Sequence, residues 1–160
     1  MPATGPPRLL RKIKFMVGDW DVVMSIKPDP NGDWVETRGK STFRFILDGA
    51  ALEQDYVGEM WGKAFLGKGY FCFNRFSGKW QHTWSDNGAA NISVFEGDFI
   101  EGRLVVSGEE KTPDGGFLSR ATTFNITDDQ FEWTLETSPD GETWAAVMKA
   151  VYSRTTELHP

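Results

Sequence analysis

The stretch that decides the fold is Gly18-Asp19-Trp20-Asp21-Val22-Val23-Met24-Ser25-Ile26. Trp20, Val22, Met24 and Ile26 fall on one face of an extended chain, whereas the opposite face is more polar. A period of two is typical of a β-strand with one buried face. The same period continues through most of the chain after Gly18, so the sequence predicts an all-β protein.

Turn signals separate these periodic runs at short, regular intervals. They are rich in Gly, Asn and Asp, which tolerate tight hairpin turns, and one of them is Gly97-Asp98. We expect strands at residues 19–27, 34–46, 50–60, 64–76, 79–85, 90–97, 99–111, 117–126, 130–137 and 143–154. The intervals leave no room for crossover helices, so neighbouring strands should pair antiparallel. An up-and-down meander of about ten twisted strands tends to close into a β-barrel, because closure removes exposed edges.

One short helix is expected before the first strand, at residues 8–16. Leu9, Leu10, Ile13 and Met16 would share its apolar face and cover one end of the barrel. Its basic side chains are read as the solvated side of that helix. We expect one domain over residues 1–160, with an ordered core at about 13–155.

Composition narrows the function classes. The net charge is −6 and no stripe of Lys or Arg is present, so nucleic acid is not an expected partner. Cys72 is the single cysteine, which excludes an internal disulfide, and its apolar surroundings indicate a buried thiol. No signal peptide is recognised, and no window approaches the about 18 consecutive apolar residues of a membrane span. We therefore expect a soluble, cytoplasmic protein without membrane association.

Aromatic residues are unusually frequent, with 12 Phe, 7 Trp and 3 Tyr. A barrel with a partly hollow, aromatic-lined interior would use them, and a well-filled sandwich is the alternative. Phe43, Phe45, Tyr56, Trp61, Tyr70, Trp84, Phe95 and Trp133 are the aromatic candidates for a cavity lining, and Met148 shares the inward column of the last strand. On two of the expected strands the alternation does not decide which residue points inward. The candidates are Tyr56 or Val57 on one strand and Tyr70 or Phe71 on the other.

Arg154 shares the inward column of the last strand with Tyr152 and Met148. A charged side chain in such a column needs a partner. In a closed barrel the first and last strands are neighbours, so the guanidinium of Arg154 can stack on the indole of Trp20. The sequence thus predicts a clasp of Gly18, Trp20 and Arg154 that closes the barrel.

The same residues carry a family resemblance. Gly18-Asp19-Trp20 resembles the Gly-x-Trp motif of lipocalins and other calycins, and Tyr152-Ser153-Arg154 resembles their closing-strand arginine. Further blocks are similar to a bacterial lipocalin-like family of unknown function, domain of unknown function 1579. These blocks are residues 16–22, 46–49 with 52–53, 78–86 and 140–144. The resemblance implies a lipocalin-like barrel and carries no established chemistry, since one fold hosts many functions.

His82 is the one histidine inside the expected barrel; His159 lies in the C-terminal tail. It could face the cavity as a polar anchor, proton shuttle or haem ligand, or it could be a hydrogen-bonded histidine of the barrel wall. One His and one Cys cannot build a closed metal site without several carboxylates, and Glu53 and Asp55 are read as a solvated strand face. No cofactor and no metal are expected.

Three functions stay open. The first is binding of a small hydrophobic or amphipathic molecule inside the barrel. The second is an enzyme of cyclase or isomerase type that shapes a reactive substrate in the cavity, with His82, Tyr56 and Tyr70 as acid–base groups. The third is a filled barrel that acts through its surface or as an oligomer, such as a homodimer. The size and lining of the interior distinguish the third from the first two.

Overall fold

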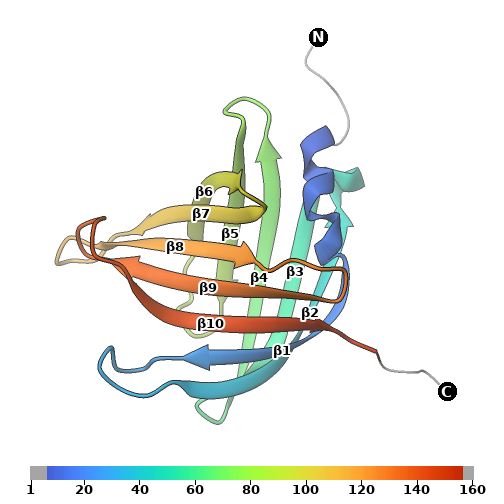
Figure 1. Ribbon diagram of the computed structural model, residues 1–160. Helices are drawn as coiled ribbons and strands as arrows, with labels where there is room; N and C mark the ends of the chain where they lie inside the picture. Colours follow the sequence, from blue (N-terminus) through green and yellow to red (C-terminus); the bar gives the residue numbers. More distant parts are fainter. Residues whose placement is uncertain (1–6, 157–160) are drawn as a thin grey trace.

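The computed structural model describes residues 7–156. Its strands, in chain order, form one closed antiparallel barrel in the order β1-β10-β9-β8-β7-β6-β5-β4-β3-β2. The strands are β1 (Gly18–Ile26), β2 (Val35–Ile46), β3 (Ala51–Met60), β4 (Lys63–Asn74), β5 (Lys79–Asp86), β6 (Ser93–Ile100), β7 (Arg103–Glu110), β8 (Phe117–Phe124), β9 (Gln130–Ser138) and β10 (Ala145–Arg154). The expected ten-stranded up-and-down barrel is confirmed. In Figure 1, β7 to β10 run across β3 to β5 as the sheet wraps on itself.

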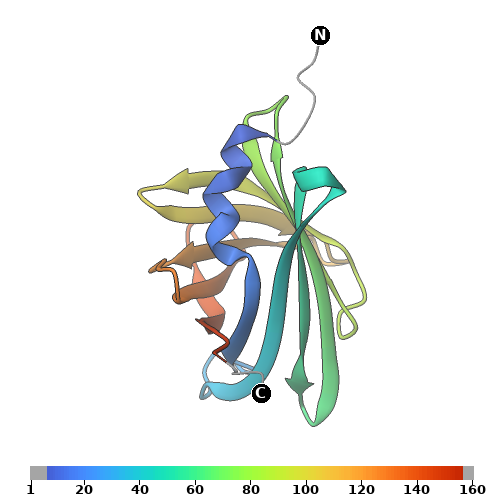
Figure 2. The ribbon, with the colours of Figure 1, turned by 90° about the vertical axis from the view of Figure 1, so that its right-hand side faces the viewer.

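Two short 3₁₀ helices, η1 (Arg8–Met16) and η2 (Leu47–Gly49), lie at the same end of the barrel (Figure 2). We call this the closed end. Leu10, Ile13 and Met16 of η1 are buried there, as the apolar spacing predicts. Leu9 was expected on the same face and is exposed instead, because a 3₁₀ turn of three residues places Leu10, Ile13 and Met16 in one row and leaves Leu9 outside it.

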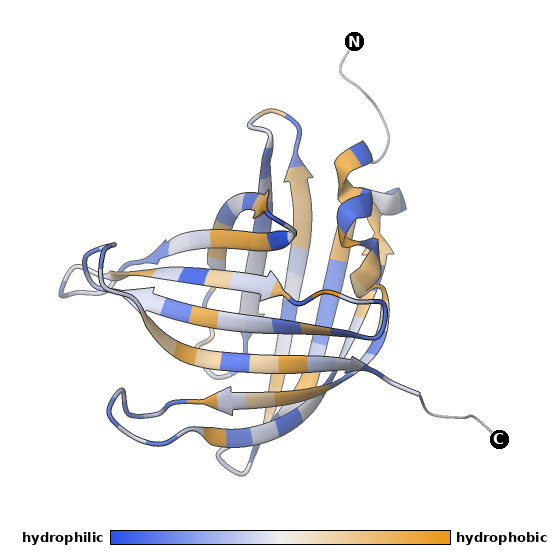
Figure 3. Ribbon diagram, viewed as in Figure 1, coloured by the Kyte–Doolittle hydropathy of each residue, from blue (hydrophilic) through white to orange (hydrophobic). Residues whose placement is uncertain are grey.

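Hydrophobic and hydrophilic residues alternate along the strands (Figure 3), and this alternation orients the side chains. Trp20, Val22 and Met24 of β1 are buried, as expected. The two ambiguous strands are also resolved. Tyr56 is buried and Val57 exposed, and Phe71 is buried while Tyr70 is 40% exposed.

The turn expected at Gly97-Asp98 is wrong. Both residues lie within β6, and the chain reverses at Glu101 and Gly102, whose φ angles are 52° and 76°. A Cβ on Gly97 would lie 1.9 Å from the carbonyl oxygen of Val105 on the neighbouring strand. This glycine is therefore required for the close approach of β6 and β7 and not for a turn.

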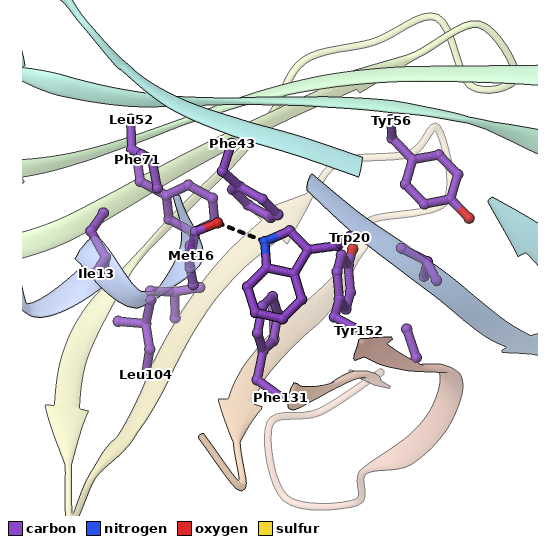
Figure 4. Close-up of a cluster of buried hydrophobic side chains, with 14 of the residues drawn as sticks. Ile13, Met16, Trp20, Phe43, Leu52, Tyr56, Phe71, Leu104, Phe131 and Tyr152 are labelled. Atoms are coloured by element: carbon purple, nitrogen blue, oxygen red, sulfur yellow. Dashed lines mark hydrogen bonds between the residues drawn. The ribbon is translucent and has the colours of Figure 1, made fainter. Parts of the chain in front are cut away.

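A filled core occupies the closed end. Trp20 is fully buried, and its indole Nε1 donates a 2.7 Å hydrogen bond to the backbone carbonyl of Met16 (Figure 4). Phe131 packs edge-on against Trp20, with ring centroids 4.7 Å apart, and stacks on Tyr152. The bond to Met16 ties the end of η1 to the first strand, so the helix is held over the closed end.

The predicted clasp is present. The Arg154 guanidinium lies 4.3 Å from the centroid of the Trp20 ring, and the two residues are register partners of β1 and β10. A Cβ on Gly18 would lie 2.6 Å from Arg154 Nη1, and Gly18 has a φ of 125°. Gly18 is thus fixed by both its backbone conformation and the space that the guanidinium needs.

A candidate binding cavity

Beyond this filled core the barrel is hollow. A cavity of about 910 Å³ extends from Met16, Phe43 and Tyr152 towards the opposite end, which we call the open end. Exposed residues form its mouth, from the β3–β4 turn, the β5–β6 loop, the β7–β8 loop and the start of β8: Trp61, Gly88, Ala89, Asn91, Lys111, Thr112 and Phe117. The volume lies within the usual range for small-molecule sites, about 300–1,000 Å³.

Apolar side chains make up most of the inner wall. Phe65 and Phe71 come from β4, Phe95 from β6, and Phe131 and Trp133 from β9. On β10, a register shift between Ala146 and Met148 lets Val147 and Met148 both line the cavity. These rings and thioethers suit the burial of an apolar molecule.

Three glycines make room for the polar aromatic side chains of the wall. A Cβ on Gly39 would lie 2.4 Å from the Tyr56 hydroxyl, and one on Gly67 would lie 2.1 Å from Trp84 Cζ2. A Cβ on Gly69 would lie 3.1 Å from both His82 Nε2 and Trp84 Cε3. The side chains of Tyr56, Trp84 and His82 therefore lie over bare backbone of the wall, and this placement keeps the space in front of them open.

His82 lies in the wall between two phenylalanine rings. Its ring centroid is 4.0 Å from that of Phe71, at an interplanar angle of 8°, and 5.7 Å from that of Phe95. Its Nε2 is buried and has no hydrogen-bond partner in the described part of the chain. Burial lowers the pKa of His82 to about 3, so the ring is neutral at pH 7. His82 therefore lies in the barrel wall, but its Nε2 does not make the hydrogen bond that the interpretation as a hydrogen-bonded wall histidine expects.

A polar group of side chains lies on the wall formed by β2, β3 and β10. Gln54 Nε2 donates to Ser41 Oγ at 3.1 Å and to the Tyr152 hydroxyl at 3.2 Å. Ser41 Oγ in turn donates to the backbone carbonyl of Asp55 at 3.1 Å. Burial raises the pKa of Tyr56 to about 12 and also raises the pKa of Tyr152, so both phenols stay protonated near neutral pH.

Within residues 7–156, no group of three or more His, Cys, Asp or Glu side chains is placed to hold a metal ion. A haem iron could reach Nε2 of His82 only after neighbouring side chains had moved, because that atom is buried. Burial also raises the pKa of the Cys72 thiol, which disfavours the thiolate. No helix in the same span is long and apolar enough to cross a membrane.

The comparison with family models places residues 8–154 in "Protein of unknown function (DUF1579)". The chain belongs to this family. The match covers the whole closed barrel of this DUF1579 member, including both ends of the clasp. The comparison with curated proteins found no match.

Several solved structures are similar to this chain in fold. Rv2717c from M. tuberculosis has a TM-score of 0.64 at 14% identity, covering 94% of this chain and 99% of that one. The S-type phycobiliprotein lyase CPES from Guillardia theta has a TM-score of 0.62 at 8% identity, covering 94% and 92%. The redesigned β-barrel mFAP0, bound to DFHBI, has a TM-score of 0.51 at 13% identity, covering 88% and 99%. The TM-scores show a shared barrel fold, and at these low identities the similarity is one of fold alone.

Most of the residues expected in the cavity of this DUF1579 protein lie in its lining. They are Phe43, Tyr56, His82, Trp84, Phe95, Trp133 and Met148, and Trp61 lies at the mouth. Their role in ligand binding stays a prediction. The lining residues that the sequence reasoning left out include Gln54, Phe65, Phe71, Phe131 and Tyr152. Gln54 could have been predicted, because it lies two residues before the buried Tyr56 on the same strand and so points to the same face.

Phe45 and Tyr70 were expected in the cavity, and this placement is wrong. Phe45 has the inward parity of Phe43, but the pairing of β2 with β1 ends at Phe43 with Gly18, so Phe45 lacks a neighbour on that side, is 36% exposed and does not line the cavity. Tyr70 lies on the outer face because Phe71 occupies the inward position. The acid–base group of His82, Tyr56 and Tyr70 is therefore not assembled.

The carboxylates Glu53 and Asp55 lie on the outer face, where both were expected to be solvated. For Glu53 this is wrong, since it is only 6% exposed and lies 2.8 Å from Arg44 Nη2 and 3.7 Å from Lys68 Nζ. Lys68 also pairs with Asp55 at 3.3 Å. Two cations thus compensate a carboxylate on the outside of the barrel, away from the cavity.

Proposed function

We propose that this protein binds a small hydrophobic or amphipathic molecule inside its barrel. The observation that carries the proposal is the cavity of about 910 Å³, with an aromatic wall and a mouth of exposed loop residues. A barrel filled with side chains would favour a role through its surface instead. The hollow open end therefore favours a ligand-binding role over the filled-barrel hypothesis.

The shape of the barrel supports this proposal. The redesigned barrel mFAP0, of related fold, was solved bound to DFHBI. At 13% identity this likeness is one of fold, so it supports the capacity of such a barrel to hold a molecule and not the identity of the ligand.

The wall of the cavity supports the proposal independently of any relative. Gly39 and Gly67 each lie beneath an aromatic side chain that a Cβ would displace, and Gly69 lies close to the rings of His82 and Trp84. An ordinary core would use such positions for side chains that fill the interior. Here glycines let the rings of Tyr56 and Trp84 approach the backbone of the wall, and the barrel keeps its cavity.

The test is uptake of the uncharged dye N-phenyl-1-naphthylamine, followed by its fluorescence increase. Ala121 is buried in the cavity wall on β8, so Ala121→Trp places an indole in the cavity and should abolish uptake. Val94, which is 58% exposed on β6, provides the matched control. Val94→Trp adds the same indole outside the barrel and should leave uptake unchanged. Equal uptake by both variants would contradict binding in the cavity.

A further inference from the structure

The charged residues of the cavity lining gather at its mouth. Among the described lining residues they are Asp86, Glu110 and Lys111, at the open ends of β5 and β7 and in the loop after β7. Asp86 accepts a 2.9 Å hydrogen bond from Trp84 Nε1, and Glu110 accepts one from Ser93 Oγ. Deeper in the cavity the described lining is uncharged, and His82 is neutral at pH 7.

Two hydroxyl donors face this uncharged interior. The Tyr56 hydroxyl lies over Gly39, and no hydrogen bond from it to another group is found among residues 7–156. The Tyr152 hydroxyl accepts from Gln54 Nε2, and within the same span its own proton has no acceptor. Both side chains line the cavity and are almost fully buried, with 3% and 6% of their surface exposed. A hydroxyl that faces a cavity in this way has its proton available for an acceptor on a bound molecule.

We propose that the cavity selects uncharged ligands that combine an apolar body with a hydrogen-bond acceptor such as a ketone, aldehyde or ester carbonyl, and that it discriminates against carboxylates. A carbonyl oxygen can accept from Tyr56 or Tyr152 and loses little hydration when it enters. A carboxylate would lose far more hydration, and no cationic side chain of the described inner wall compensates its charge. This inference rests on the proposed function and specifies the ligand class.

The experiment compares three probes with the same naphthalene body at pH 7.5, by isothermal titration calorimetry. They are 2-acetylnaphthalene, which has a carbonyl, 2-ethylnaphthalene, which has none, and 2-naphthoate, which is charged. We expect the ketone to bind about tenfold more tightly than the hydrocarbon or the carboxylate. Tyr56→Phe combined with Tyr152→Phe should reduce the affinity for the ketone to that for the hydrocarbon.

Tyr70→Phe is the matched control, because it removes a phenol hydroxyl from the outer face and should leave all three affinities unchanged. Circular dichroism checks that each variant is folded. Tyr56→Phe and Tyr152→Phe are also measured singly, and at least one of them should weaken binding of the ketone without changing that of the hydrocarbon.

The outcomes separate the two proposals. Equal or tighter binding of 2-naphthoate, or equal binding of ketone and hydrocarbon, would overturn the selectivity and leave cavity binding intact. The same holds if the double variant keeps the full preference for the ketone. If none of the probes binds and N-phenyl-1-naphthylamine is not taken up either, the proposed function fails and the selectivity fails with it.

Discussion

The guanidinium of Arg154 lies 4.3 Å from the ring centroid of Trp20 and donates hydrogen bonds to the backbone carbonyls of Phe15 at 2.9 Å, Val17 at 2.8 Å and Asp128 at 2.8 Å. One side chain therefore joins β10 to the end of η1, to the start of β1 and to the β8–β9 loop. The planar fork of an arginine can make these contacts together, whereas a lysine ammonium cannot.

Arg154→Lys should therefore lower the free energy of unfolding by about 2–4 kcal/mol, from the lost hydrogen bonds and weaker stacking. Urea unfolding followed by tryptophan fluorescence measures this value. Arg103→Lys is the control, since Arg103 is exposed and its guanidinium lies 5.5 Å from the Phe124 ring. Similar stability changes in both variants would show that the backbone contacts of Arg154 contribute little.

Gly67→Ala should push the Trp84 indole off the wall, because the new Cβ would lie 2.1 Å from Trp84 Cζ2. We expect a loss of about 1–3 kcal/mol in stability and weaker uptake of N-phenyl-1-naphthylamine. Combining Gly67→Ala with Trp84→Phe removes the part of the indole that the new Cβ would meet. The double variant should then recover much of the loss, and a double-mutant cycle measures the coupling. Additive effects would mean that the glycine and the indole are independent.

His82 makes stability depend on pH. The unfolded chain binds this proton with the ordinary pKa of 6.5, whereas burial lowers the pKa in the folded state to about 3. Between these values the unfolded state holds more protons, so stability falls as the pH falls below 6.5. From pH 7.5 to pH 5 this contribution is about 2 kcal/mol.

His82→Phe removes the titrating group and keeps a flat ring between Phe71 and Phe95. The variant should lose about 2 kcal/mol less than the parent protein over the same pH range. Urea unfolding at pH 7.5, 6 and 5 gives the comparison. Since other groups titrate in both proteins, the difference between them is the relevant quantity, and parallel pH profiles would refute a buried neutral imidazole.

Replacing Phe43 and Phe45 separately by alanine tests which of the two side chains belongs to the cavity wall. Phe43 is 3% exposed and lines the cavity, so Phe43→Ala should cost about 3–5 kcal/mol and alter dye uptake. Phe45 is 36% exposed beyond the last β1–β2 pair, so Phe45→Ala should cost about 1 kcal/mol and leave dye uptake unchanged. Thermal unfolding and dye titration on the same samples check both expectations. Weaker uptake in Phe45→Ala would place Phe45 in the binding site.

The order of the strands follows closely from the sequence, because strand length, alternation and most turn signals are local properties. Gly97-Asp98 shows the limit of this reasoning. A glycine needed for a turn and one needed beneath a neighbouring strand look alike in a single chain, and only the packing of Gly97 against Val105 separates them.

By itself the sequence determined the all-β class, the closing pair Trp20–Arg154 and part of the cavity lining, since two-residue periodicity assigns the faces of a strand. Only the tertiary structure decided which inward residues surround empty space. Phe43 and Phe45 have the same parity, but the pairing of β2 with β1 ends at the Gly18–Phe43 pair, so Phe43 is buried and Phe45 is partly exposed. Where a barrel is filled and where it is hollow depends on contacts between distant strands, such as Tyr56 over Gly39, which no local pattern encodes.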